Sequence, residues 1–458
     1  MSSKRSAGAL ARNVTEAAIA SATSAVANTL AGRWRCPSEP ARTRCDRTER
    51  MVTYRPVAGR VAITGLGSVS SLGGSAPVFA EALLRGADGF RPLTEFAHVA
   101  LRTPRAARIA GFDPARLIAP LKLRRIDDVG RITIGAALEA MTQAGFPRRA
   151  EGYDDLGVAL GSFTAGVHAS AEYLETYLRQ GAAASPAILF SNTVGNAPAS
   201  VCALELGLRG PNATLTHKEA SGLAAIEFAA RLIRRGRAPA VVAGGADVLE
   251  LVFYRVHDWF AVMAPGDEPC RPYDVERRGF LMGEGAFLFV LEDDARARAR
   301  GARILGHVTG TASAGSPDRF NAWPAAPDTL VRVMRDAIAR AGLEPEAIDV
   351  VYAAANGSPV LDATEARALR LVFGDRAVPV VAVKGALGES GAAGCAGIAS
   401  ALLFADRGIA PPTVGLATRG PDTPAGARAE TQPVDGRRAL VLSVGSGGTV
   451  VAVVVEAA

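Results

Sequence analysis

The chain has 458 residues, 49% of them apolar, enough for a sizeable core in two domains or in one large double-layered unit, and a soluble globular protein is expected. Its net charge of +6 lies mostly in residues 1–50, so the rest is nearly neutral, which argues against nucleic-acid binding. No apolar run reaches the roughly 18 residues of a membrane-spanning helix. The five scattered cysteines show neither metal-ligand spacing nor a disulfide pattern. We therefore expect a protein of the reducing cytoplasm without a metal site.

Residues 1–55 are rich in Ala, Ser, Thr and Arg, with a possible helix at residues 14–30. We interpret them as a disordered leader or an over-extended reading frame, because Met51 opens a segment that runs directly into the first strand. Glu16 interrupts anything resembling a secretory signal. An organelle transit peptide is the alternative, against which the acidic residues count.

Residues 56–300 alternate between strands and helices. A dinucleotide-binding fingerprint at residues 65–70 is disfavoured, because Ser70 stands where Gly or Ala is needed. The apolar pattern predicts strands at residues 61–64, 157–161, 212–216, 238–245 and 287–291. It predicts helices at residues 121–145, from residue 191 onward, and after residue 219.

The chain is organised around residues 210–236, which form a strand, a turn and a helix. Such an elbow places Glu219 at the start of the helix, where unpaired N–H groups and the helix dipole favour negative charge. A nucleophile belongs at this position.

The elbow resembles that of the β-ketoacyl synthases, the condensing enzymes of fatty-acid and polyketide assembly. Their elbow reads GPN, four residues, then Thr-Ala-Cys-x-Ser/Thr-Gly. Here Glu219 stands at the cysteine, and Ser221 and Gly222 follow as the pattern expects. Residues 270–286, CRPYDVERRGFLMGEGA, are similar to the family's RPFD and GFVMGEGAG motifs.

This resemblance implies an α/β fold of the thiolase-like kind, five-layered α-β-α-β-α, with two pseudo-repeated halves at residues 56–300 and 301–458. The second half supplies its own series of strands and helices. They are expected at residues 304–311, 329–341, 350–354, 364–373, 378–384, 393–404 and 439–443.

The family needs a cysteine, two histidines and backbone donors for the oxyanion. The motif positions that hold the two histidines in the family are Asn356 and Glu389 here, and the family's lysine is retained as Lys384. The glycine turn, Gly445-Ser446-Gly447, also survives, so the N–H groups of Ser446 and Glu219 are expected to face the site. The gating phenylalanine of that turn is lost.

Two interpretations of the carboxylates stay open. Glu219 and Glu389 could approach each other in an apolar cleft and do acid-base work, one with a raised pKa. Alternatively, Glu219 caps its own helix and pairs with Lys218, Lys384 or a donor left by the lost histidines.

Other residues are weaker candidates for a catalytic nucleophile or base. His217 is either an acid-base group or a structural histidine, and no histidine follows His307. Cys202 is interpreted as a core residue. Cys270 and Cys395 remain candidates for a displaced nucleophile.

Binding residues are inferred from the same resemblance. Phe163 and Phe280 are expected at the acyl pocket. Three basic residues, Lys122, Arg124 and Arg125, are either contacts for an acyl carrier protein and its phosphopantetheine arm or a solvated charge run. No cofactor is implied beyond that arm, which enters as part of the substrate.

Loss of all three catalytic positions on a retained framework resembles a chain-length factor, the non-condensing partner that shapes the acyl tunnel of a ketosynthase. That class commonly has glutamine at the elbow, so glutamate is a departure. One alternative is an active carrier-protein-dependent decarboxylase, hydrolase or atypical 3-oxoacyl synthase that uses Glu219 or Glu389. Another is a homodimeric scaffold.

Overall fold

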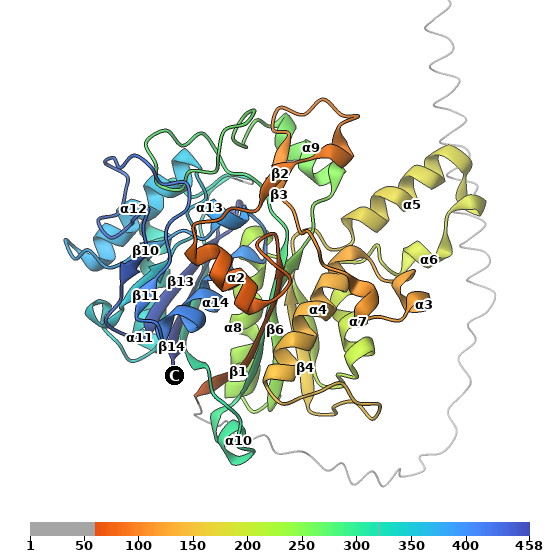
Figure 1. The fold of residues 1–458 in the computed structure, drawn as a ribbon, viewed down its shortest axis with the longest axis horizontal. Helices are drawn as coiled ribbons and strands as arrows, with labels where there is room; N and C mark the ends of the chain where they lie inside the picture. The colour runs from red at the N-terminus through yellow and green to blue at the C-terminus, as the bar shows by residue number, and fades with distance from the viewer. Residues whose placement is uncertain (1–59, 320) are drawn as a thin grey trace, which may run out of the picture. The chain divides into compact units, whose positions relative to one another are not determined.

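A mixed sheet of ten strands is the centre of the computed structural model, which describes residues 60–319 and 321–458 (Figure 1). These residues belong to one unit, Tyr54–Ala458. The predicted leader at residues 1–55, with its possible helix, lies outside the described residues. The strand order is β10-β9-β13-β14-β8-β1-β7-β6-β4-β5. The strands are Val61–Ser70 (β1), Leu156–Gly161 (β4), Asn212–Leu215 (β5), Ala240–Asp247 (β6), Gly285–Asp293 (β7), Gly306–Gly315 (β8), Val350–Tyr352 (β9), Val380–Val381 (β10), Arg438–Val444 (β13) and Thr449–Ala457 (β14).

The sheet repeats its own topology. In the order β5-β4-β6-β7-β1 the first two pairings are parallel and the next two antiparallel. The order β10-β9-β13-β14-β8 shows the same pattern. Antiparallel pairing of β1 with β8 at residues 61–63 and 306–308 joins the two series. The predicted pseudo-repeat is therefore confirmed, while its division at residue 300 stays a prediction.

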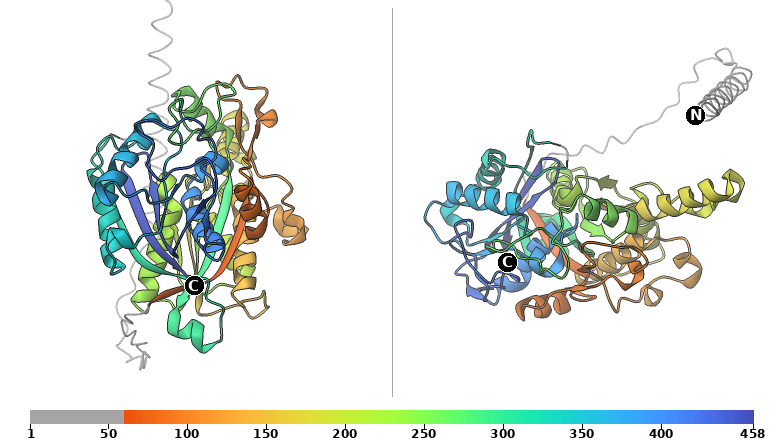
Figure 2. Two further views of the ribbon diagram at one scale, coloured as in Figure 1. Left: turned by 60° about the vertical axis from the view of Figure 1, so that its left-hand side comes forward. Right: turned by 90° about the horizontal axis from the view of Figure 1, so that it is seen from above.

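Helices cover and separate the two halves of the sheet. α8 and α14 pack in the middle, α4 and α7 cover the first half, and α11 and α12 cover the second, which gives the predicted five layers (Figures 1 and 2). The α-helices are Ala76–Leu84 (α2), Pro120–Leu123 (α3), Asp128–Gln143 (α4), Val167–Gln180 (α5), Ala187–Phe190 (α6), Ala197–Leu206 (α7), Ser221–Arg234 (α8), Leu251–Trp259 (α9), Asp294–Ala299 (α10), Asp328–Arg340 (α11), Pro359–Phe373 (α12), Lys384–Leu387 (α13) and Ala393–Ala405 (α14).

Smaller elements complete the described unit. Strands Phe90–Pro92 (β2) and Arg105–Ala107 (β3) form one two-stranded sheet, and Ile409–Ala410 (β11) and Gln432–Pro433 (β12) form another. The 3-10 turns are Thr94–Phe96 (η1), Pro114–Arg116 (η2), Ala182–Ala184 (η3), Lys218–Ala220 (η4) and Pro345–Ala347 (η5).

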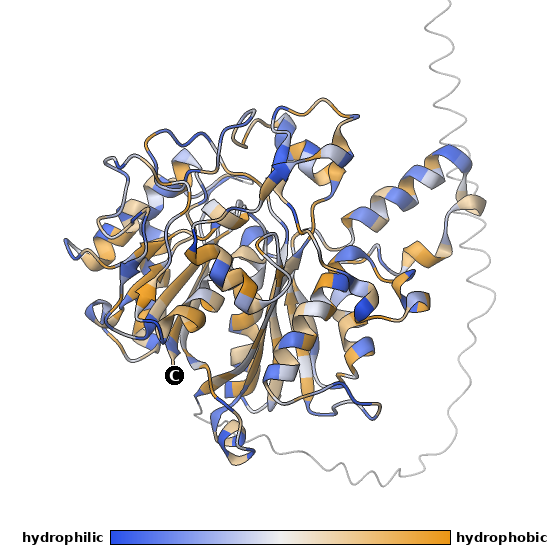
Figure 3. Cartoon of the chain, viewed as in Figure 1, coloured by the Kyte–Doolittle hydropathy of each residue, from blue (hydrophilic) through white to orange (hydrophobic). Residues whose placement is uncertain are grey.

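β6, β7 and most of β14 are buried on both faces, which explains their nearly unbroken apolar runs (Figure 3). In β7, Phe287 and Phe289 face the middle helices, while Leu288 and Val290 face the outer layer with α4. β14 divides its valines in the same way between the middle core and the core beneath α11. Because side chains alternate between the two faces of a strand, each half of the sheet packs one face on the shared middle helices and the other on its own outer helices.

Two expectations differ from the structure. The helix predicted at residues 121–145 is divided into α3 and α4, because the Asp127 carboxylate accepts a hydrogen bond from the Gly130 N–H (2.8 Å) and caps a new helix. The helix expected from residue 191 begins at Ala197, at the start of α7. Within residues 60–319 and 321–458, no helix is long and apolar enough to cross a membrane.

Candidate functional site

The elbow forms as predicted. β5 ends at Leu215, and the chain turns through η4 into α8. Lys218 adopts a positive φ of 51°, and the Ser221 hydroxyl donates to the Lys218 carbonyl and accepts from the His217 N–H (2.9 Å). The Gly222 N–H donates to the carbonyl of Gly391 (2.8 Å), just before α14. The elbow is therefore fixed where the two middle helices begin.

The carboxylate of Glu219 is buried and bound by one residue of the opposite half. The Ser446 N–H donates to Oε2 and the Ser446 hydroxyl donates to Oε1, both at 2.8 Å. The Ser443 hydroxyl donates to the Glu219 carbonyl at 2.8 Å. The expectation that Glu219 caps its own helix is wrong, since its side-chain oxygens face the turn between β13 and β14 instead.

The two positions that hold histidines in the family are bonded to each other. The Asn356 amide donates to Oε2 of Glu389 (2.6 Å), and the Lys384 ammonium donates to the same oxygen (2.8 Å). The Ser358 N–H donates to Oδ1 of Asn356 (2.9 Å), which fixes the orientation of the amide. The side chains of this buried network therefore already have hydrogen-bond partners within the protein; they are Asn356, Lys384 and Glu389.

The two carboxylates influence each other, as one of the two interpretations required. Burial raises the pKa of Glu389 to about 7; Lys384 opposes this and the charge of Glu219 adds to it. Lys384 pairs with Glu389, so pairing of Lys384 with Glu219 is not observed. With a pKa of about 7, Glu389 is close to half-protonated at neutral pH. Its neighbour Glu219 is already hydrogen-bonded to Ser446 in the glycine turn.

Two further buried acids hold the segment that carries Asn356. Asp362 accepts from the Asn356 N–H (3.0 Å) and the Tyr273 N–H (2.8 Å), and burial raises its pKa to about 7. Glu365 accepts from the Tyr273 hydroxyl (2.6 Å) and from the Ala354 N–H (2.7 Å). The retained motif at residues 270–286 thus has a structural task around the site.

Asp247 at the end of β6 was missed in the sequence. Its carboxylate accepts from the Ser162 hydroxyl (2.7 Å), the Phe163 N–H (2.7 Å) and the Gly391 N–H (2.6 Å), and burial raises its pKa. It ties the loop after β4 to the start of α14. No spacing pattern marks it, because its partners lie in distant segments.

The remaining nucleophile candidates are three buried thiols, and the remaining base candidate is an exposed histidine. Cys202 belongs to α7 and is buried in the core cluster that α7 shares with α4, and Cys270 donates to the Asn356 carbonyl (3.1 Å). Burial raises the pKa of the Cys202, Cys270 and Cys395 thiols, which disfavours the thiolate. The His217 side chain is exposed and lines a cavity with Phe228 and Arg231 behind the elbow.

Five aromatic side chains, called here the aromatic rim, stand beside the site: Phe163, Phe253, His257, Phe280 and Trp323. Phe163 and Phe253 pack edge to face at 4.6 Å between ring centroids, and Phe280 and Trp323 do so at 6.2 Å. The ring of His257 lies 6.3 Å from both Phe163 and Phe280. Both predicted pocket residues belong to the rim, and His257 is a neighbour that the sequence did not indicate.

The predicted carrier contacts lie at and just beyond α3. Lys122 forms a salt bridge with Glu205 (2.9 Å), while Arg124 and Arg125 are exposed. Their role in carrier binding stays a prediction.

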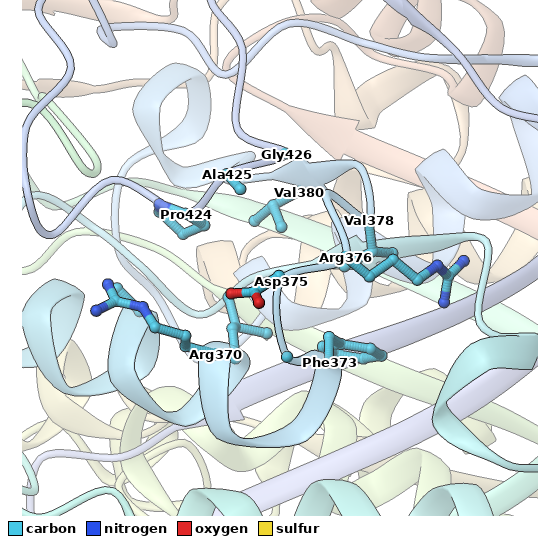
Figure 4. A pocket seen from close by; sticks show the side chains of 12 residues that line it. Arg370, Phe373, Asp375, Arg376, Val378, Val380, Pro424, Ala425 and Gly426 are labelled. Carbon is cyan, nitrogen blue, oxygen red and sulfur yellow. The ribbon is translucent and has the colours of Figure 1, made fainter.

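A hollow at the end of α12 lies apart from these groups. Figure 4 shows Arg370, Phe373 and Arg376 around it, opposite residues 424–426, and no predicted site residue lines it. In the part of the chain that the structure describes, no three His, Cys, Asp or Glu side chains gather as metal ligands would.

The comparison with family models matches the β-ketoacyl synthase N-terminal domain to residues 58–297 and its C-terminal domain to residues 305–417. The chain belongs to the β-ketoacyl synthase family. This places it among the proteins of fatty-acid and polyketide biosynthesis.

Individual relatives of this family cover most of the chain. The 3-oxoacyl-(acyl-carrier-protein) synthase 2 of Coxiella burnetii is 30% identical over 366 residues, 78% of this chain and 88% of that protein. A β-ketoacyl synthase 2 of the actinorhodin polyketide, from Streptomyces coelicolor, is 33% identical over 408 residues, 85% and 96% of the two chains. The solved ishigamide ketosynthase/chain length factor has a TM-score of 0.80 at 29% identity and covers 87% of this chain and 99% of that one.

Proposed function

We propose that this β-ketoacyl synthase homologue is a non-condensing subunit of the chain-length-factor kind, which pairs with an active ketosynthase and shapes the tunnel for its growing chain. The observation that carries the proposal is the pair of hydrogen bonds from Ser446 to the Glu219 carboxylate. A condensing site needs free donors where the thioester oxygen gains charge. Here an internal anion occupies the Ser446 N–H, and no thiol stands at the elbow to accept an acyl group.

The two other altered positions support the same conclusion. Asn356 and Glu389 bind each other and Lys384, so their donors and acceptors are used within the protein. Malonyl decarboxylation needs groups that donate to the developing enolate. A network that satisfies itself favours a structural task.

Features of the surface support a protein partner. β5 is an edge strand, paired with β4 alone among the described strands, and such edges can take a strand from another chain. In α5 only Ala169 is buried, and this helix and α6 expose a group of large apolar side chains. They are Leu174, Tyr177, Leu178, Ile188 and Phe190. The similar ishigamide protein is a ketosynthase/chain length factor by its title, which agrees with a paired assembly.

The test mixes the purified chain with acyl- and malonyl-loaded carrier protein, with and without a ketosynthase from the same genome, and identifies products by mass spectrometry. We expect no condensation by the chain alone and elongated β-keto product with the partner. A partner that makes the same products without this chain would contradict the proposal. So would condensation by the chain alone.

A second candidate is favoured by one observation, the near-neutral pKa of Glu389 next to the Lys384 ammonium. It is a carrier-dependent decarboxylase or hydrolase in which Glu389 transfers a proton. Turnover of a loaded carrier by the isolated chain, lost in both E389Q and E219Q, would establish it. A stable homodimer that neither turns over nor alters the products of any ketosynthase would instead indicate a scaffold.

A further inference from the structure

The hollow at the end of α12, called here the α12 hollow, has a volume of about 140 Å³ and an apolar interior. Its inner wall consists of side chains that are each at most 9% exposed: Ala366, Leu369, Phe373, Val378 and Val380. An apolar cavity of about 150 Å³ holds one molecule of the size of benzene. The α12 hollow is therefore large enough for one aliphatic side chain.

The walls of the α12 hollow are fixed by backbone contacts. Gly374 ends α12 with a φ of 62°, and its N–H donates to the Arg370 carbonyl (2.9 Å), so the chain turns back beside the hollow. On the opposite wall the Val380 N–H donates to the Gly426 carbonyl at 3.1 Å. A Cβ at Gly426 would lie 1.7 Å from the Val378 carbonyl oxygen, so this close approach requires glycine. The hollow is thus formed before any ligand enters.

Two opposite charges stand at the exposed mouth of the α12 hollow and do not pair with each other. Figure 4 shows the Asp375 carboxylate below Pro424 and Ala425, with the Arg370 guanidinium to its left. Among the described residues, the Asp375 carboxylate has no hydrogen-bond or ion-pair partner. The Arg370 guanidinium donates to the Pro421 carbonyl (3.1 Å), which uses one of its five N–H groups. Both charged groups are therefore available to a ligand.

The second arginine beside the α12 hollow is held elsewhere. Nη1 of Arg376 donates to the Pro345 carbonyl (3.0 Å) and Nη2 donates to the Ile348 carbonyl (2.6 Å). Figure 4 shows its side chain directed away from Asp375. A ligand at the mouth would thus meet one anion and one cation. A ligand with a single charge would leave one of these two groups facing a like charge or no partner, which is unfavourable.

We propose that the α12 hollow binds a free α-amino acid with an aliphatic side chain. The Asp375 carboxylate accepts from the ligand ammonium, Arg370 donates to the ligand carboxylate, and the side chain occupies the apolar interior. A free α-amino acid carries both charges and the side chain on one carbon, whereas a peptide terminus offers only one of the charges. This inference goes beyond the proposed function and does not depend on it, because no residue of the buried site lines the hollow.

The test measures binding of L-leucine, L-isoleucine and L-valine to the full chain by isothermal titration calorimetry, with the melting temperature as a second readout. Three further compounds separate the parts of the ligand. Glycine has both charges without a side chain, N-acetyl-L-leucine lacks the ammonium, and L-leucinamide lacks the carboxylate.

Two variants each remove one charge from the mouth of the hollow. They are D375N and R370Q, both at exposed positions, so the fold should be retained. The matched controls are D336N, at an exposed position of α11, and R367Q, at an exposed position of α12; neither residue lines the hollow. Thermal unfolding of each variant without ligand verifies its fold.

We expect the three aliphatic amino acids to bind and to raise the melting temperature. D375N and R370Q should each weaken binding about tenfold or more, the value of one hydrogen bond between charged groups, whereas D336N and R367Q should bind as the wild type does. Glycine, N-acetyl-L-leucine and L-leucinamide should each bind about tenfold or more weakly than leucine, because each lacks one of the three contacts.

Four results would overturn the inference. The first is no heat and no rise in melting temperature with any of the three amino acids at about 10 mM, a concentration that detects a Kd of about 1 mM. The second is equal affinity for leucine and either single-charge compound, which would show that the two charges do not act together. The third is equal affinity for glycine and leucine, which would exclude the apolar interior. The fourth is binding that is insensitive to D375N or R370Q, which would place the ligand elsewhere.

Discussion

Removal of the Ser446 hydroxyl tests the contact on which the proposed function depends. In S446A the backbone N–H still donates to Oε2 of Glu219, but Oε1 loses its donor. A hydrogen bond to a buried charge contributes roughly 1.5–3 kcal/mol, so the free energy of unfolding should fall by about that amount. The control S443A removes a hydrogen bond of the same 2.8 Å length to the uncharged Glu219 carbonyl, worth roughly 0.5–1.5 kcal/mol.

Burial alone predicts the opposite ranking, which makes the comparison decisive. Ser443 is 0% exposed and Ser446 is 8% exposed, so loss of packing would make S443A the more harmful change. Urea denaturation at pH 7 measures both variants. The Ser446 hydroxyl also lies 3.4 Å from Nζ of Lys218, and a double-mutant cycle of S446A with E219Q isolates the contact with Glu219. An S446A cost no greater than that of S443A, or strict additivity in the cycle, would refute a carboxylate bound to the glycine turn.

The buried network around Lys384 yields three further expectations. K384M leaves the Glu389 carboxylate without its cation and should lower the free energy of unfolding by about 3–5 kcal/mol, and the double variant K384M/E389L should regain most of it in urea denaturation. Burial raises the pKa of Glu389 from 4.5 to about 7, so the folded state binds this proton more tightly, and stability is lost as pH rises from 4.5 through 7. The stability of the wild type relative to E389Q should therefore fall by up to about 3 kcal/mol over that range in pH-dependent denaturation, and a flat difference would contradict the shift. Y273F removes the hydroxyl that donates to buried Glu365 and should cost about 1–3 kcal/mol by the same assay, whereas an unchanged midpoint would show that the pair contributes nothing.

Much of the fold is readable from residue pattern because strands such as β4, β6 and β7 are apolar runs. The strand predicted at residues 287–291 lies inside β7, and the strand and turn of the elbow lie where the apolar run and the polar residues 217–219 indicate. β14 was overlooked although Thr449–Ala457 is almost continuously apolar. A strand buried on both faces lacks alternation, so periodicity does not distinguish it from a buried helix segment.

The division between α3 and α4 shows the limit of periodicity. The apolar spacing of residues 121–145 continues through the break, so it predicts one helix. The capping bond from the Gly130 N–H to Asp127 decides otherwise, and its signal, an Asp preceding an apolar run, was present in the sequence.

For the site, the sequence indicated the positions of the residues but not the contacts between them. Motif spacing indicated Glu219, Asn356 and Glu389, and the structure brings them together in the buried region between the halves. The partner of Glu219 was not predictable, because Ser446 is 227 residues away and meets it only when the two halves assemble. His257 could not be found either, since its neighbours come from three separate segments and no motif marks α9.

The chain differs from the family at three catalytic positions, Glu219, Asn356 and Glu389. The structure indicates which catalytic step each of these replacements removes. E219C would place a thiol at the helix start, where the thiolate is favoured, and would free the Ser446 N–H for a thioester oxygen. Attack of that thiolate on an acyl-carrier thioester forms a new thioester and releases the carrier thiol, a step that needs neither histidine position as a donor. Decarboxylation of malonyl would still fail, because Asn356 and Glu389 remain bonded to each other and to Lys384. We therefore expect E219C to gain the mass of an acyl group without forming β-keto product, and N356H/E389H in that background to be required for condensation. Condensation by E219C alone would show that the network around Lys384 does not silence the subunit, whereas a folded E219C that remains unacylated would show that the elbow is closed to the carrier arm.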